Sequence, residues 1–107
     1  MTLMECLNSR KECVEAIRLQ EKRLGETVRG SEEYYTVKRE TRAAMHKKHE
    51  LTMWLYDSYH YRAIREVLTD AFMDGDFTVP QEIIARIESK RKELIEGEKR
   101  MLEAAEV

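Results

Sequence analysis

The sequence predicts an all-α protein of three long antiparallel helices, arranged as a helical hairpin or three-helix bundle with a coiled-coil-like arm. Hydrophobic residues make up 42% and charged residues 37% of the 107-residue chain, a balance typical of long amphipathic helices. One proline and four glycines leave room for few turns, so the elements must be few and long. A chain of this length is expected to form a single domain, residues 1–107.

The first helix is predicted over about residues 2–29. Its seam positions recur at alternating steps of four and three residues, which is the spacing of a coiled coil. The seam consists of Leu3, Leu7, Arg10, Val14, Ile17, Glu21, Leu24 and Val28. Gly30 follows, and we expect it to cap the C-terminus of this helix.

The second helix is predicted over about residues 31–73. Ser31 is a favourable N-cap, and Glu32 and Glu33 place negative charge in the first turn. At about 100° per residue, the apolar face of this helix changes sides around residues 51–56. One side carries Tyr34, Val37, Thr41, Ala44, Leu51 and Leu55, and the nearly opposite side carries Met53, Tyr56, His60, Ile64, Val67, Leu68 and Ala71. We interpret it as a central helix that packs against the first helix along its first half and against the third along its second half.

The third helix is predicted over about residues 79–103. Before it, Asp74-Gly75-Asp76 is expected to form a turn. Thr78 is the expected N-cap and Pro80 lies in the expected first turn. The apolar positions of this helix are Ile83, Ile84, Ile87, Leu94, Ile95, Met101 and Leu102. Short connections make both neighbours of the central helix antiparallel to it.

The hairpin of the first two helices is expected to lie in an oligomer interface. Pairing centred near Gly30 places Arg10 opposite Glu50 and Glu21 opposite Lys38 and Arg39, so each seam charge meets an opposite charge. The Gly30 end should extend past the third helix as a two-helix arm, which buries too little apolar surface to be stable alone. We therefore expect a homo-oligomer whose interface contains Val14, Ile17, Leu24, Val28, Tyr34 and Val37.

A third side of the second helix is the candidate binding surface. It has an aromatic centre between two basic ends and consists of Lys47, Trp54, Ser58, Tyr61 and Arg65. In one interpretation, Trp54 and Tyr61 stack or bury against a partner. Lys47 and Arg65 then engage acidic groups or phosphate. In the other interpretation, the two rings fill a helix junction or a homo-oligomer interface, and the cations are solvated.

Charge is segregated along the sequence. Residues 38–49 are basic, whereas residues 66–82 contain acidic side chains and neither lysine nor arginine. This segregation favours docking between copies, or a basic face for nucleic acid or an acidic partner; the alternative is a solvated helix face. The net charge of −2 argues against a sequence-specific DNA-binding protein.

The sequence shows no catalytic motif: it has neither a glycine-rich phosphate loop nor a Gly-x-Ser-x-Gly turn. His46 and His49 lie three residues apart with two lysines between them, which does not fit a zinc-binding helix, so no metal or other cofactor is expected. Cys6 and Cys13 lie too far apart on one helix for a disulfide, which indicates free thiols in a reducing cytoplasm. Because no signal peptide or membrane-spanning run is recognisable, we expect a cytoplasmic protein that does not enter a membrane.

These observations favour a non-enzymatic helical module that binds or sequesters a partner, such as an acidic protein, and that works as a homo-oligomer. The alternative is an oligomeric binder of an anionic small ligand such as a nucleotide, which would use Lys47, Trp54, Tyr61 and Arg65. Such a binder would suit a phage-type counter-defence role, in which the protein sequesters a component of the host.

Overall fold

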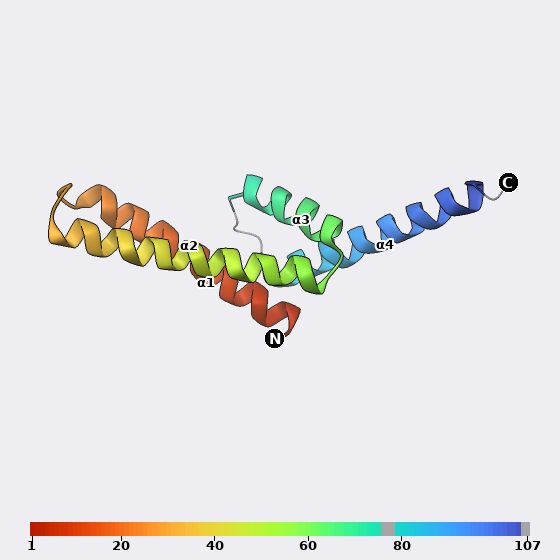
Figure 1. Ribbon diagram of the computed structural model, residues 1–107, viewed down its shortest axis with the longest axis horizontal. Coiled ribbons are helices and arrows are strands. Elements are labelled where there is room, and N and C mark those ends of the chain that lie inside the picture. The colour runs from red at the N-terminus through yellow and green to blue at the C-terminus, as the bar shows by residue number, and fades with distance from the viewer. Residues whose placement is uncertain (76–78, 106–107) are drawn as a thin grey trace. The chain divides into compact units, whose positions relative to one another are not determined.

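The computed structural model describes residues 1–75 and 79–105, and every element in those ranges is a helix (Figure 1). The four helices are α1 (Leu3–Glu26), α2 (Glu32–Ser58), α3 (Tyr61–Met73) and α4 (Pro80–Ala105). The predicted all-α class is therefore confirmed, but the predicted number of three helices is wrong. The segment predicted as one helix over residues 31–73 forms two helices, α2 and α3. Asp76 of the predicted turn and the predicted cap Thr78 lie outside the described residues.

The predicted second helix is interrupted at Tyr59 and His60. The Tyr59 N–H still donates to the carbonyl oxygen of Leu55 at 3.1 Å, as in a helix. His60 then leaves the helical conformation, with φ −66° and ψ 109°, and becomes the N-cap of α3. Its Nδ1 accepts a hydrogen bond from the Ala63 N–H at 3.4 Å. The His60 side chain therefore satisfies one of the backbone N–H groups left free in the first turn of α3, which favours the start of a new helix at this position.

The chain folds as two compact units, Met1–Trp54 and Leu55–Val107. The first unit holds α1 and most of α2, and the second holds the last turn of α2 together with α3 and α4. The two units therefore share α2, since their boundary falls inside that helix.

In the first unit, α1 and α2 form an antiparallel hairpin (Figure 1). The Cys6 thiol donates to the carbonyl oxygen of Leu51 at 3.4 Å, and Gln20 donates to the Glu40 carboxylate at 2.9 Å. The buried residues of the unit are Cys6, Leu7, Arg10, Cys13, Val14, Val37 and Thr41. Arg10, the charge within the predicted seam, donates from Nε to the Thr52 hydroxyl at 3.1 Å. Thr52 lies two residues beyond Glu50, the partner predicted for Arg10.

The turn of the hairpin differs from the prediction in detail. Helix α1 ends at Glu26, three residues before the predicted end, because Thr27 is extended and its N–H and hydroxyl both bond to the Leu24 carbonyl. Gly30 has φ +88° and so supplies the left-handed residue of the turn rather than the cap of α1. Ser31 accepts a hydrogen bond from the Tyr34 N–H at 3.2 Å, which confirms the predicted N-cap of α2.

In the second unit, α3 packs against α4. The buried residues of these two helices are Ala63, Ile64, Val67, Leu68, Ala71, Pro80, Ile83 and Ile87. Lys90 pairs with Glu66 at 2.9 Å and Arg86 with Asp74 at 3.9 Å, so the two helices are antiparallel. At about 1.5 Å per residue, the 13 residues of α3 can flank only half of the 26 residues of α4. The C-terminal half of α4 continues past α3 (Figure 1).

Candidate partner-binding surfaces

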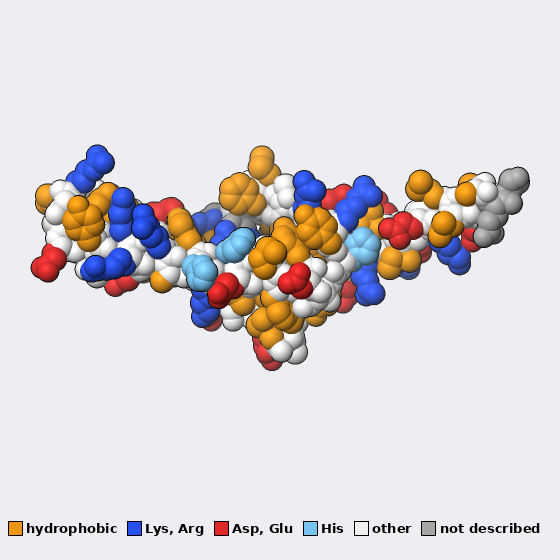
Figure 2. Space-filling model, in the orientation of Figure 1, with side chains coloured by type: hydrophobic (Ala, Val, Ile, Leu, Met, Phe, Trp, Pro, Cys, Tyr) orange, Lys and Arg blue, Asp and Glu red, His pale blue; other side chains and the backbone are white. Residues whose placement is uncertain are grey.

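The outer side of α3 exposes aromatic, apolar and basic side chains together. We call this the α3 surface; it consists of Tyr61, Arg62, Arg65, Thr69, Phe72 and Met73. Phe72 is 64% and Met73 77% exposed, and hydrophobic side chains protrude from the C-terminal end of α3 in Figure 2. The Tyr61 ring lies 4.9 Å from that of Tyr56, with the two planes tilted by 49°. Exposed rings beside arginines are typical of protein interfaces.

Glu66 borders the α3 surface and is held by two cations. It accepts from Lys90 of α4 at 2.9 Å and from Arg62 at 3.1 Å. The hydrogen bond from Lys90 is the main reason that the pKa of Glu66 lies below its ordinary value. The same bond raises the pKa of Lys90. The Glu66–Lys90 ion pair holds this side of α3 against α4. Arg65, the residue before Glu66, is exposed to solvent.

The predicted binding residues lie on two helices rather than along one face of a single helix. Tyr61 and Arg65 lie one turn apart on α3, and both are exposed; Ser58 is the last residue of α2. Trp54 is half-buried on α2, in the first unit. Lys47, also on α2, borders a shallow groove between α1 and α2 whose floor is made of small side chains. Sequence reasoning missed Phe72 and Met73, although two large apolar residues beside the predicted turn were a visible signal.

The residues predicted for the oligomer interface are divided between the interior of the hairpin and its surface. Val14 and Val37 are buried within the chain, so they belong to the core of the hairpin and are not available to a second copy. Ile17, Leu24 and Tyr34 are half-buried, whereas Val28, next to the turn, is 76% exposed. The hairpin therefore leaves a smaller apolar surface than the seam pattern predicted, and most of it lies near its turn.

The C-terminal half of α4 exposes large apolar side chains. We call Ile95, Met101 and Leu102 the α4 surface; Met101 is 75% and Leu102 68% exposed. At about 100° per residue, Met101 continues the apolar stripe of the buried Ile83 and Ile87, and Ile95 and Leu102 widen that stripe toward the side of Ile84. The stripe was visible in the sequence, but the shortness of α3, which leaves its second half exposed, was not.

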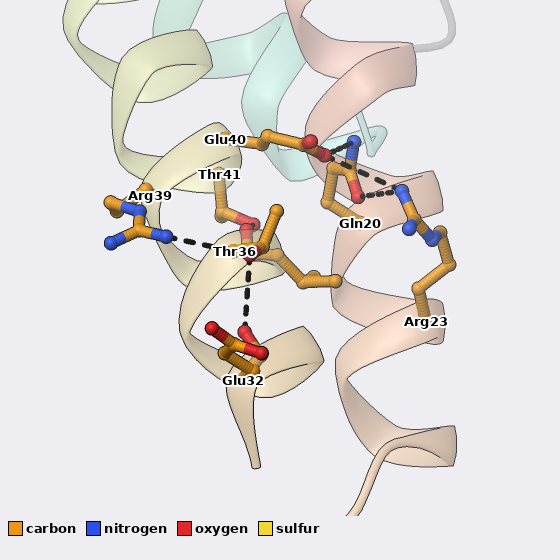
Figure 3. Close-up of polar contacts among 8 residues, drawn as sticks. Gln20, Arg23, Glu32, Thr36, Arg39, Glu40 and Thr41 are labelled. Atoms are coloured by element: carbon orange, nitrogen blue, oxygen red, sulfur yellow. Dashed lines mark hydrogen bonds and ion pairs between the residues drawn. The ribbon is translucent and has the colours of Figure 1, made fainter. Parts of the chain in front are cut away.

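The side of α2 that faces away from α1 is basic. Figure 2 shows lysine and arginine side chains gathered over the N-terminal half of α2. Figure 3 shows why the neighbouring carboxylate does not neutralise them: Glu40 points toward α1, where it accepts from Gln20 and Arg23. Arg39 points the other way and donates to the Thr36 hydroxyl at 3.4 Å. Among the described residues, Arg39 and Arg42 form no ion pair.

Comparison of the chain with protein-family models, curated proteins and solved structures gave no match. None of the helices in residues 1–75 and 79–105 combines the length and apolarity needed to cross a membrane. Within the same residues, no three His, Cys, Asp or Glu side chains are grouped so as to hold a metal ion.

Proposed function

We propose that this protein is a non-enzymatic helical binding module that works as a homo-oligomer. The observation that supports it is the α4 surface, where Ile95, Met101 and Leu102 are exposed on a half-helix that extends past α3. A helix of this length without a packing partner is only marginally stable in water, because most helical stability in proteins comes from burial of an apolar face. Covering by a second copy would supply that burial.

The size of the α4 surface bounds how tight such an oligomer can be. Full burial of a Leu, Ile or Met side chain stabilises by about 1.5–3 kcal/mol. Six such residues in a pair would give about 9–18 kcal/mol if each started fully exposed. Because Ile95, Met101 and Leu102 are 45%, 75% and 68% exposed, the gain available is smaller, on the order of 10 kcal/mol at most. Association costs about 4–15 kcal/mol, so α4 alone would hold the copies weakly. Further contact area is available at Phe72 and Met73 of the α3 surface and at Val28 of the hairpin turn.

The native mass of the protein in solution tests the proposal. Light scattering of the wild type should give a multiple of the chain mass of 12.7 kDa. Leu102→Glu places a charge in the α4 surface and should return the mass to that of one chain. Arg100→Gln makes the same change in net charge outside the α4 surface and should leave the oligomer intact. A wild type that scatters as a single folded chain at micromolar concentration would refute the oligomer.

The alternative is an oligomeric binder of an anionic small ligand such as a nucleotide. It is favoured by the exposed cations of α2, since Arg42 and Lys47 form no ion pair in the described part of the chain. A bound nucleotide would be recognised by the ultraviolet absorbance of its base in the purified protein. An oligomer that purifies without such absorbance would support the first function over this one.

A further inference from the structure

Helix α2 carries a second seam on the side opposite the hairpin. We call it the outer seam; its residues are Tyr35, Arg39, Arg42, His46, His49 and Met53. They recur at alternating steps of four and three residues, as the members of a coiled-coil seam do. At about 100° per residue, they lie roughly 150° around the helix from the buried Val37 and Thr41. This spacing places the six residues on one face that runs along α2.

Every residue of the outer seam is exposed in the structure. Tyr35 is 54% exposed, and Met53 and Met45, which precedes His46 in the sequence, are also exposed large apolar side chains. Helix α1 covers the hairpin seam, where Val37 and Thr41 are buried. The outer seam therefore has an exposed apolar side chain at each end, Tyr35 and Met53, that a partner could bury.

The centre of the outer seam is positively charged. Arg39 and Arg42 form no ion pair among the described residues, and Glu40 is turned toward α1 (Figure 3). His46 pairs with Glu50 at 3.0 Å. Two arginines without a carboxylate partner are a surface to which negative side chains of a partner are complementary.

We infer that the outer seam of α2 is a docking surface for an acidic amphipathic helix of a partner protein. The inference rests on the proposed function as a binding module. A helix suits this surface as the occupant, because a second helix can cover a long face of α2 along its whole length. The order of side chains specifies the partner: apolar residues at both ends, opposite Tyr35 and Met53, and Glu or Asp between them, opposite Arg39 and Arg42. Methionine adapts readily to an apolar neighbour.

Two other occupants fit the outer seam less well. In an antiparallel pair of identical outer seams, Arg39 would lie opposite His49 and Arg42 opposite His46, with no carboxylate on the seam to offset four arginines. Nucleic acid would engage the arginines but would leave the exposed methionines without an apolar partner.

Fluorescence anisotropy with a labelled synthetic peptide tests the inference. The peptide is a helix with leucines at its outer heptad positions and glutamates at its central ones. The controls are a scrambled peptide of the same composition and a labelled single-stranded RNA of the same net charge. The wild-type protein should bind the patterned peptide at least about tenfold more tightly than either control. Equal affinity for the scrambled peptide, or tighter binding of the RNA, would overturn the inference.

Charge reversal locates the binding on α2. The double variant Arg39→Glu/Arg42→Glu should lose at least about tenfold in affinity for the glutamate peptide and should gain affinity for a peptide with lysines at the central positions. The matched control, Lys92→Glu/Lys99→Glu on α4, should bind like the wild type. Light scattering of the same samples separates the two proposals. A single-chain wild type that binds the patterned peptide would refute the oligomer alone, and an oligomer that does not bind it would refute the outer seam alone.

Discussion

Single side chains decide how the two helices of the second unit hold together. Glu66 of α3 lies between Lys90 of α4 and Arg62 of its own helix, so one carboxylate accepts from two cations. The side chains of Glu66 and Lys90 are each about one-third exposed, at 36% and 32%, so solvent weakens the attraction without abolishing it. The pair therefore contributes modestly, and its contribution depends on pH.

Replacement of Glu66 by Gln should reduce stability at neutral pH but not in acid. The pKa of Glu66 is lower in the folded chain than its ordinary value of about 4.5. Its contribution is therefore present above the unfolded pKa and is lost as pH falls through the folded pKa. In urea titrations, the difference in midpoint between wild type and Glu66→Gln should shrink between about pH 5 and pH 3. The exposed Glu98→Gln should match the wild type throughout. A midpoint difference that does not change with pH would contradict the assigned role.

At the scale of elements, the sequence predicted the helical class, the α1–α2 hairpin, the Ser31 cap and the start of the last helix. It did not predict the break between α2 and α3, because neither Tyr59 nor His60 is a strong helix breaker and no glycine or proline marks the position. The change of apolar side around residues 51–56 was the available signal. We interpreted it as one straight helix with two neighbours, whereas the structure uses a short interruption.

The same break explains how much of the candidate site was predictable. A recognition surface that required Lys47, Trp54, Tyr61 and Arg65 on one face depended on an uninterrupted helical period. Tyr61 and Arg65 keep their relation because both lie within α3. The exposed α3 and α4 surfaces depend on the relative lengths of two packed helices, which periodicity in one helix does not report.

His60 is the residue through which the break can be tested. His60→Ala removes the acceptor for the Ala63 N–H and should lower the free energy of unfolding by about 1 kcal/mol. His60→Asn should restore most of the loss, because asparagine is a strong N-cap. Urea unfolding followed by circular dichroism measures both. An alanine variant that is more stable and more helical than the wild type would show that α2 and α3 merge into one helix.

At the scale of the whole molecule, the chain divides into two small units that share α2. Each unit holds about half of the 107 residues, a size at which the buried core of a domain is only marginally sufficient. Association between copies is a common way for such a chain to increase its buried apolar surface.

If the folded chain is an oligomer, its thermal midpoint should depend on protein concentration. Binding that involves only the folded state stabilises it by mass action, so the midpoint should rise as the protein is concentrated. The midpoint of Leu102→Glu should be lower and independent of concentration. Differential scanning calorimetry measures the thermal midpoint at each protein concentration. A range of about a hundredfold in concentration is wide enough to give a clear shift in the midpoint. A wild-type midpoint that is constant over this range would exclude assembly coupled to folding.

The two buried cysteines give the protein an internal reporter of its local unfolding. Cys6 and Cys13 are both buried on α1, and residues 55–107 contain no cysteine. Burial raises the pKa of the Cys6 thiol, an effect that the nearby Arg10 charge offsets only in part. Because the thiolate is the reactive form, a thiol reagent should label the native chain only when α1 separates from α2. The labelling rate therefore measures the free energy of opening of the first unit without any introduced probe, while the second unit remains silent.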